Sequence, residues 1–160
     1  ILVCPASTAL RPSRAQPGIA GTIMHKPTGL YVYGGYAEDQ DNNRGELVAA
    51  AQQALVQEDD RTWFIQAGIE QKWMSLGKTT LFGEYRNDQA GSNVNGATIR
   101  TQSADLDFWA AGIVQNVDAA AMDLYLIYRH ADGDVLVGTN AASTKLDDFD
   151  MLITGARIQF

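Results

Sequence analysis

The sequence holds few of the residues that build disulfides, metal centres or nucleic-acid surfaces. Its single cysteine, Cys4, cannot form a disulfide within the chain. Its two histidines, His25 and His130, have no cysteine or second histidine at metal-ligand spacing, and we interpret both as residues at strand ends. The 12 Lys and Arg are outnumbered by 19 Asp and Glu, giving a net charge of −7. Nucleic-acid binding needs a basic face, so we expect no nucleic-acid partner.

Long apolar runs and enzyme motifs are also missing. No stretch reaches the ~18 consecutive apolar residues of a membrane-spanning helix, although barrel strands need no such run because their apolar residues alternate with polar ones. No serine lies in a nucleophile-elbow pattern, and no glycine-rich phosphate loop is present. We therefore expect no catalytic activity and no cofactor.

Proline is scarce and unevenly placed. Three of the four prolines, Pro5, Pro12 and Pro17, lie in the first seventeen residues. Proline cannot donate a backbone hydrogen bond to a neighbouring strand. We therefore predict an irregular N-terminal segment over residues 1–18, followed by a β domain over residues 19–160.

What the chain does contain is a series of strand-length runs with alternating polarity. Seven runs cover residues 19–26, 30–37, 62–73, 78–87, 105–116, 121–130 and 147–160. The connections between them are alternately short and long, as in membrane barrels, which have short turns at one rim and long loops at the other. The pattern predicts an all-β, antiparallel transmembrane β-barrel with about seven or eight strands in this chain.

The number and direction of the runs bear on completeness. Seven is an odd number, whereas bacterial single-chain barrels have an even number of strands. The first run leads into a short turn, so it runs inward from the outside, whereas a complete barrel that begins in the periplasm must begin with an outward strand. Open sheet edges are not tolerated in hydrocarbon. We therefore expect this chain to be the C-terminal portion of a larger barrel.

One side of the runs is polar. A charge that faces lipid at mid-depth costs ~2–4 kcal/mol, so these side chains are expected to face the lumen. The predicted pore-lining residues are Gln66, Glu70, Lys72, Glu84, Arg86, Asp123, Arg129, Arg157 and Gln159. We interpret Glu70 and Glu84, each with a cation two residues away, as members of a salt-bridge ladder rather than as a catalytic pair.

The opposite side is apolar and carries aromatic residues near the strand ends. Five of them are predicted to form lipid-facing girdles: Trp63, Trp73, Tyr85, Tyr128 and Phe160. In the run over residues 105–116 the assignment is ambiguous, because Trp109 shares its parity with Asp107. Alternation alone also fits a soluble barrel whose apolar sides point inward.

The long acidic connection over residues 38–61 resembles the start of a calcium loop at Asp39, Asp41 and Asn43. The glycine comes one place late, at Gly45, and the twelfth position is Ala50 rather than Glu, so the segment is not an EF-hand. We predict no defined metal site and leave loose binding of a divalent ion open. Residues 45–57 of the same connection have the periodicity of a short helix.

Several segments together resemble the C-terminal region of outer-membrane porins from alphaproteobacteria. They are residues 28–32, 64–73, 76–85, 106–109 and 123–129 and the C-terminal run. The resemblance follows strand order and turn positions over roughly residues 19–160. It implies an outer-membrane β-barrel that passes small hydrophilic solutes by diffusion, with the lipid bilayer, small solutes and ions as partners and a homotrimer as the possible assembly.

The expected function is therefore passive diffusion along a polar lumen wall in a bacterial outer membrane. Two alternatives remain open at this point. One is a soluble calycin-like barrel that binds a small apolar ligand. The other is a small, non-conducting outer-membrane barrel that acts as an anchor or adhesin through its acidic loops.

Overall fold

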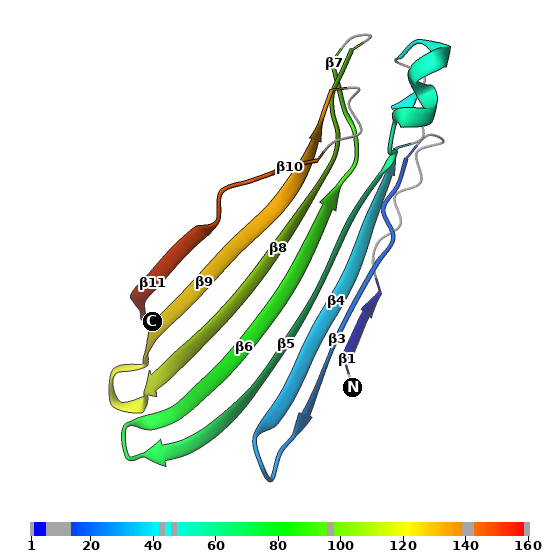
Figure 1. Cartoon of the computed structure of the whole chain (residues 1–160). Coiled ribbons are helices and arrows are strands. Elements are labelled where there is room, and N and C mark those ends of the chain that lie inside the picture. The colour runs from blue at the N-terminus through cyan, green and yellow to red at the C-terminus, as the bar shows by residue number, and fades with distance from the viewer. Residues whose placement is uncertain are drawn as a thin grey trace.

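The structure is a computed structural model that describes residues 2–5, 14–41, 44–45, 48–95, 98–138 and 143–158. These residues form one antiparallel sheet (Figure 1). The strands are β1 (Leu2–Pro5), β2 (Arg14–Ala15), β3 (Gly18–His25), β4 (Leu30–Asp41), β5 (Asp59–Met74), β6 (Gly77–Ala90), β7 (Asn93–Asn95), β8 (Thr98–Val117), β9 (Met122–Val137), β10 (Ser143–Lys145) and β11 (Phe149–Ile158). Two short 3₁₀ helices, η2 (Ala50–Leu55) and η3 (Asp118–Ala120), lie in the connections.

Neighbours in the sequence are neighbours in the sheet. The order is β1-β3-β4-β5-β6-β8-β9, after which β10 and β11 both pair with β9. The short strands β2 and β7 pair with β4 and β8. Every pairing is antiparallel, so the all-β, antiparallel part of the prediction is confirmed.

The predicted barrel is not closed within the described residues. Here β1 pairs only with β3, and β11 pairs only with β9, so the sheet is open and has two free edges. No helix of the described residues combines the length and the apolar character that a membrane crossing requires.

The N-terminal segment differs from the irregular chain that its prolines predicted. Leu2–Pro5 pairs with β3, with Pro5 opposite Ile19, and Arg14–Ala15 pairs with the end of β4. Because β1 has a partner on one side only, a missing backbone N–H is tolerated there. Pro5 therefore lies in an edge strand.

The strands also run further than the alternation of polar and apolar residues predicted. β4 continues to Asp41, β8 begins at Thr98 and β9 continues to Val137, all within stretches that we predicted as polar loops. Backbone groups make the ladder hydrogen bonds, so polar residues extend a strand as long as its partner is in reach. Part of each predicted long loop is therefore a continuation of its flanking strands, and in the first loop this part is limited to residues 38–41 and 59–61.

The short turns lie together at one end of the sheet, called here the turn end (Figure 1). They comprise residues 26–29, residues 75–76 and η3. Gly29 has φ +68°, and a Cβ there would come within 1.8 Å of the Glu70 carbonyl oxygen, so only glycine fits. The projecting strands, β7 and η2 lie at the other end, called the extended end.

Candidate functional site

The strand register divides the sheet into an apolar face and a polar face. The apolar face carries the directly opposed or alternating residues Ile23, Val32, Ile65, Ile69, Leu81, Ile113, Leu126 and Leu152. The polar face carries Gln66, Glu70, Lys72, Glu84, Arg86, Asp123, Arg129 and Arg157. All eight predicted pore-lining residues that are described therefore share one face, while Gln159 lies outside the described residues.

Exposure on the two faces is inverted relative to a water-soluble sheet. Along β5, Trp63 and Ile65 are 42% and 47% exposed, whereas the intervening Phe64 and Gln66 are only partly exposed. The same alternation holds in the middle of β6 and β9. Side chains crowd on the inner side of a curved sheet and spread on its outer side. The polar face is therefore the inner, concave side.

Aromatic rings on the polar face lie over glycines of the neighbouring strand. A Cβ on Gly68 would come within 2.7 Å of the Tyr31 hydroxyl, and a Cβ on Gly112 within 2.6 Å of Phe82 Cζ. Each pair is directly opposed in the register. The ring thus occupies the space above the glycine, a pairing that stabilises glycine in strands. As a result these rings lie over the backbone of the polar face instead of projecting from it.

The charges of the polar face are paired, but with different partners from those expected. Glu70 accepts from Lys78 Nζ at 2.6 Å instead of from Lys72, and Glu84 accepts from Arg129 at 3.3 Å instead of from Arg86. Lys78 lies on the neighbouring strand β6, diagonal to Glu70, and Arg129 lies on β9, two strands away from Glu84 with Ala110 of β8 between them. The partners of these two carboxylates therefore depend on how the strands are aligned with one another. The remaining pairs are Lys72–Asp118, Arg86–Asp88 and Asp123–Arg157.

A groove of about 490 Å³ opens on this face near the turn end. Its lining includes Gln66, Glu70, Lys72, Asp118, Asp123 and Arg157. Both donors and acceptors line it, and Gln66 donates to the Tyr31 hydroxyl at 2.9 Å. Such a surface can replace part of the hydration shell of a polar solute.

Five aromatic residues form a line across the apolar face. They are Tyr36, Trp63, Tyr85, Trp109 and Tyr128, one from each of β4, β5, β6, β8 and β9. Ring centroids are 5.2 Å apart for Trp63 and Tyr85 and 5.2 Å apart for Trp109 and Tyr128. Sequence reasoning had selected three of the five. Tyr36 is not among the predicted girdle residues, and the face of Trp109 is ambiguous from the sequence.

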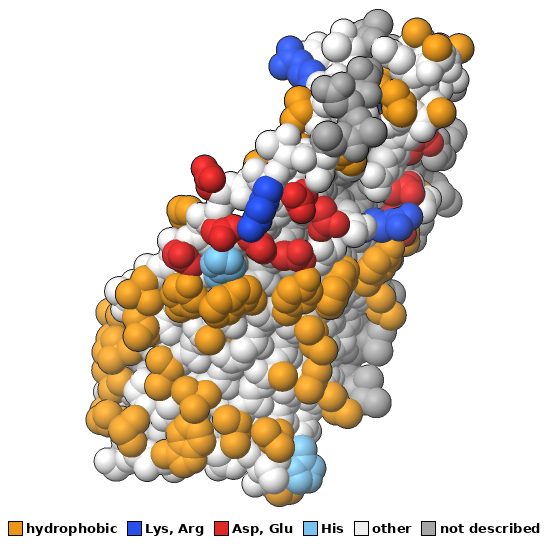
Figure 2. All heavy atoms as spheres, viewed as in Figure 1, with side chains coloured by type: hydrophobic (Ala, Val, Ile, Leu, Met, Phe, Trp, Pro, Cys, Tyr) orange, Lys and Arg blue, Asp and Glu red, His pale blue; other side chains and the backbone are white. Residues whose placement is uncertain are grey.

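Carboxylates lie directly beyond this line, toward the extended end. The hydroxyls of Tyr36, Tyr85 and Tyr128 donate to Glu38, Asp107 and Asp150, respectively. Figure 2 shows the resulting boundary, with hydrophobic side chains on one side and charged side chains on the other. The shared parity of Trp109 and Asp107 is thereby explained, because the two lie on opposite sides of the boundary.

The other predicted girdle residues are less informative. Trp73 lies near the turn end and is 53% exposed. Phe160 lies outside the described residues. The apolar face between Trp73 and the aromatic line has a furrow of about 1070 Å³, whose floor is formed by the small residues Ala67, Gly83 and Ala111.

In the acidic segment considered for loose calcium binding, Asp39 and Arg44 are engaged in ion pairs. Asp39 accepts from the Arg14 guanidinium and from Gln16, and this interaction lowers the pKa of Asp39 to about 2. Arg44 pairs with Asp60 in the same region and lowers the pKa of that carboxyl. Asn43, the third candidate ligand, lies outside the described residues.

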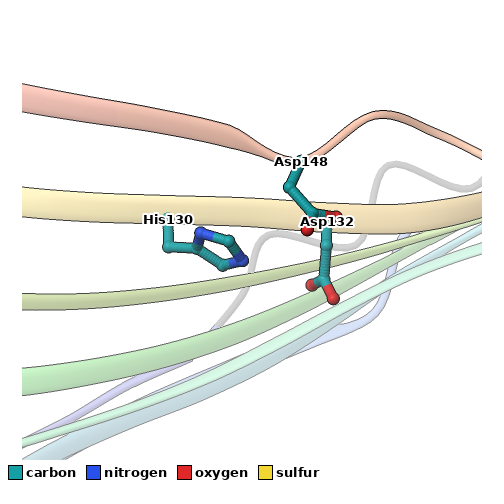
Figure 3. Close-up of side chains that lie close together, drawn as sticks. All are labelled: His130, Asp132 and Asp148. Atoms are coloured by element: carbon teal, nitrogen blue, oxygen red, sulfur yellow. The ribbon is translucent and has the colours of Figure 1, made fainter.

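A second cluster, which sequence reasoning missed, contains His130, Asp132 and Asp148 (Figure 3). The potential ligand atoms of these residues all lie within 4.8 Å of one another. His130 and Asp132 alternate on β9, and Asp148 comes from the segment before β11. The His-x-Asp spacing on one strand was the signal in the sequence that could have indicated this cluster. Its third member, Asp148, lies in a segment that folds back beside β9 and could not be found from that spacing.

Comparison of the chain with protein-family models, with curated proteins and with solved structures gave no match.

Proposed function

We propose that this chain forms part of the wall of an outer-membrane porin, a β-barrel channel through which small hydrophilic solutes diffuse passively. In this assignment the apolar face contacts lipid and the polar face lines the lumen. The lipid bilayer and small solutes are the partners, and the outer membrane of a Gram-negative bacterium is the location.

The observation that carries the proposal is the inverted exposure of the two faces. Large apolar side chains such as Leu124, Leu126 and Leu152 are 43–66% exposed on the outer side, while charged residues occupy the inner side. In water this arrangement leaves a broad apolar surface uncovered, which soluble monomers rarely do. A hydrocarbon environment removes that cost, and a water-filled lumen solvates the polar face.

The slant of the aromatic line supports a membrane boundary. Trp63 is directly opposed to Tyr36, and Trp109 is directly opposed to Tyr85. On β6 the residue opposed to Trp63 is Asn87, and Tyr85 lies two residues nearer the turn end. On β9 the residue opposed to Trp109 is His130, and Tyr128 likewise lies two residues nearer the turn end. Of the four strand-to-strand steps from β4 to β9, two leave the line level and two move it two residues toward the turn end.

At ~3.3 Å per residue and ~4.8 Å between strands, this descent corresponds to an inclination of roughly 35°. Strands in membrane barrels tilt by about 35–45°. Aromatic residues placed along such a line on tilted strands lie at one depth, which is the requirement for a girdle. The tyrosine hydroxyls then point toward the polar layer, as amphipathic rings do at a membrane interface.

The polar face supplies the solute path in this proposal. Its cations and carboxylates are paired, so the wall offers hydrogen-bonding groups with little net charge. Opposed charges on a pore wall select solutes by size and local field. The open edges at β1 and β11 need further strands in a bilayer, because unpaired backbone groups are not tolerated in hydrocarbon.

The proposal is tested by folding the protein in detergent, inserting it into planar bilayers and measuring conductance, with the detergent alone as the control. Stepwise conductance is expected where the edges at β1 and β11 pair with further strands, including those of other copies of this chain, together with protection of the apolar face from proteolysis in vesicles. Well-folded, inserted protein that conducts no ions would contradict the channel and favour the anchor or adhesin alternative.

The apolar furrow favours a second candidate, a soluble sheet that binds an apolar ligand over Ala67, Gly83 and Ala111. The two candidates differ in solubility. A monodisperse, folded protein in detergent-free buffer that binds a fluorescent fatty acid would support the second candidate and overturn the membrane assignment.

A further inference from the structure

We propose that His130, Asp132 and Asp148 bind a first-row transition-metal ion of the Zn²⁺ type at the boundary between the apolar face and the carboxylates. This site is independent of the channel, because it lies on the side of the sheet opposite the polar face.

The geometry brings three ligands of suitable chemistry to one point. His130 and Asp132 are two residues apart on β9, so their side chains leave the strand on the same face. The backbone N–H of Leu146 donates to the Gly133 carbonyl at 2.8 Å, which holds the segment containing Asp148 beside β9. In Figure 3 one imidazole nitrogen points toward the two carboxylates. Zn²⁺ takes nitrogen and oxygen ligands at about 2.0–2.2 Å, so small side-chain rotations would bring the three ligands onto one ion, with water in the fourth position.

The imidazole distinguishes this cluster from an ordinary acidic surface. Carboxylates alone suit Mg²⁺ or Ca²⁺, whereas imidazole suits Zn²⁺, Cu²⁺, Fe²⁺ and Ni²⁺. His130 Nδ1 lies 2.8 Å from Asp150 Oδ1, which leaves Nε2 for the metal. Metal-binding histidines commonly donate their second N–H to a carboxylate, and this contact orients the ring. Asp150 would therefore position His130.

Asp148 already pairs with Lys145 Nζ at 3.5 Å, so the carboxylate without a partner is that of Asp132, and its charge is the second feature that favours a cation. Asp132 is directly opposed to Asp107, and Asp134 is directly opposed to Asp105. Like charges in directly opposed positions destabilise a sheet. Asp107 is stabilised by Tyr85 and Asn87, but among the described residues no hydrogen bond or ion pair reaches the Asp132 carboxylate. A divalent ion between His130 and the two carboxylates would offset this repulsion.

The neighbouring Trp109 provides a direct reporter. Its ring centroid lies 5.4 Å from that of His130, whereas Trp63 and Trp73 are on other strands. A paramagnetic ion such as Cu²⁺ or Ni²⁺ bound at His130 should quench Trp109 strongly. The chain with Trp63→Phe and Trp73→Phe isolates this signal.

The experiment uses the folded full chain, in detergent or in buffer, freed of metal with EDTA. Zn²⁺ is titrated calorimetrically, and Cu²⁺ is titrated by Trp109 fluorescence. One saturable site per chain is expected. His130→Ala should weaken binding at least tenfold, Asp148→Asn should weaken it similarly, and Asp150→Asn should weaken it about 10–100-fold through the orientation of His130.

His25→Ala is the matched control, because His25 lies at the turn end, where its ring bonds Thr28. It should leave Zn²⁺ affinity unchanged. Circular dichroism checks that each variant is folded, and His130→Gln serves if His130→Ala is not. Unsaturable binding, or equal affinity in the folded His130 variants and the parent chain, would overturn the proposal. Loss of binding in Asp39→Asn but not in Asp148→Asn would overturn it as well.

Discussion

Arg129 donates to Glu84 at 3.3 Å across three strands, and the two side chains meet above the small residue Ala110. Ala110 is directly opposed to both residues and is only 4% exposed. A larger residue there would separate the pair. The ion pair thus depends on three strands in register, and it is the central charge pair of the polar face.

Removing one member of this pair should change ion selectivity if the polar face lines a channel. Glu84→Gln leaves a cation on the wall and should increase the preference for anions, while Arg129→Gln should increase the preference for cations. Reversal potentials in a KCl gradient measure both shifts. Asp150→Asn, which removes a charge from the opposite side of the sheet, should leave the reversal potential unchanged.

The stability cost of these two changes should be small. Arg129 is 39% exposed and Glu84 is 21% exposed, and pairs of this kind contribute about 0–1 kcal/mol. Large destabilisation by either variant, or shifts of the same sign in both, would contradict the assignment of the pair to a solvated channel wall.

Two adjacent residues on β5 test which face meets lipid. Ala67 lies on the apolar face and Gln66 on the polar face. In phospholipid vesicles, Ala67→Arg should destabilise the protein by ~2–4 kcal/mol and Gln66→Arg by about 0–1 kcal/mol, because only the first change places a charge in hydrocarbon. Urea unfolding followed by tryptophan fluorescence gives both values.

The two substitutions differ by one position and introduce the same side chain, so the propensity of arginine for a strand cancels in the comparison. Equal effects would mean that the apolar face is not in lipid. The reverse order would mean that the polar face is the one excluded from water.

Much of this architecture could be predicted from alternation and turn residues, because each residue's parity decides its face. The partners of each charged residue in its ion pairs could not be predicted in this way. Glu70 bonds Lys78 and Glu84 bonds Arg129 because of the inter-strand register, and register is not visible within one strand. The extension of β4 to Asp41 was missed for a related reason, since backbone pairing continues where hydrophobic alternation has ended.

The metal cluster and the depth of Trp109 on the apolar face could not be predicted from single strands either. Asp148 reaches His130 only because residues 146–148 fold back along β9, a tertiary contact with no local sequence signal. Trp109 was ambiguous because parity gives the face of a residue but not its depth. The aromatic line supplies the depth, and it exists only when five strands are placed side by side.

The contact between Phe82 and Gly112 predicts a site where adding one methyl group is costly. A Cβ at Gly112 would lie 2.6 Å from Phe82 Cζ and 3.1 Å from Ile127 Cγ1. Gly112→Ala should therefore destabilise the protein by about 1–3 kcal/mol through overpacking. Its matched control is Gly83→Ala, where the nearest atom, the Ala110 carbonyl oxygen, is 3.8 Å away.

Gly83→Ala should lie within about 0.5 kcal/mol of the parent chain, since the new methyl group finds open space. Equilibrium urea unfolding of both variants provides the comparison. Combining Gly112→Ala with Phe82→Leu should recover part of the loss, because the shorter side chain clears the added Cβ. Additive losses in the double variant would contradict the proposed overlap.

The ion pair between Arg14 and Asp39 predicts an acid-dependent loss of stability at the extended end. The Arg14 guanidinium lowers the pKa of Asp39 to about 2, from an ordinary value of 3.8. A lowered pKa means that the folded state favours the carboxylate, so the contribution is fully present above about pH 4 and is lost as the pH falls toward 2. Arg14 is 47% exposed, so screening by solvent keeps this contribution small.

Arg14→Gln should therefore be slightly less stable than the parent chain at about pH 5–7, and the difference should shrink below about pH 4. Urea unfolding at several pH values measures it. Asp39→Asn should have no further effect in the Arg14→Gln chain, because the interaction is already absent. A difference that persists unchanged at pH 2.5 would show that Arg14 stabilises the protein through packing of β2 against β4 instead of through its charge.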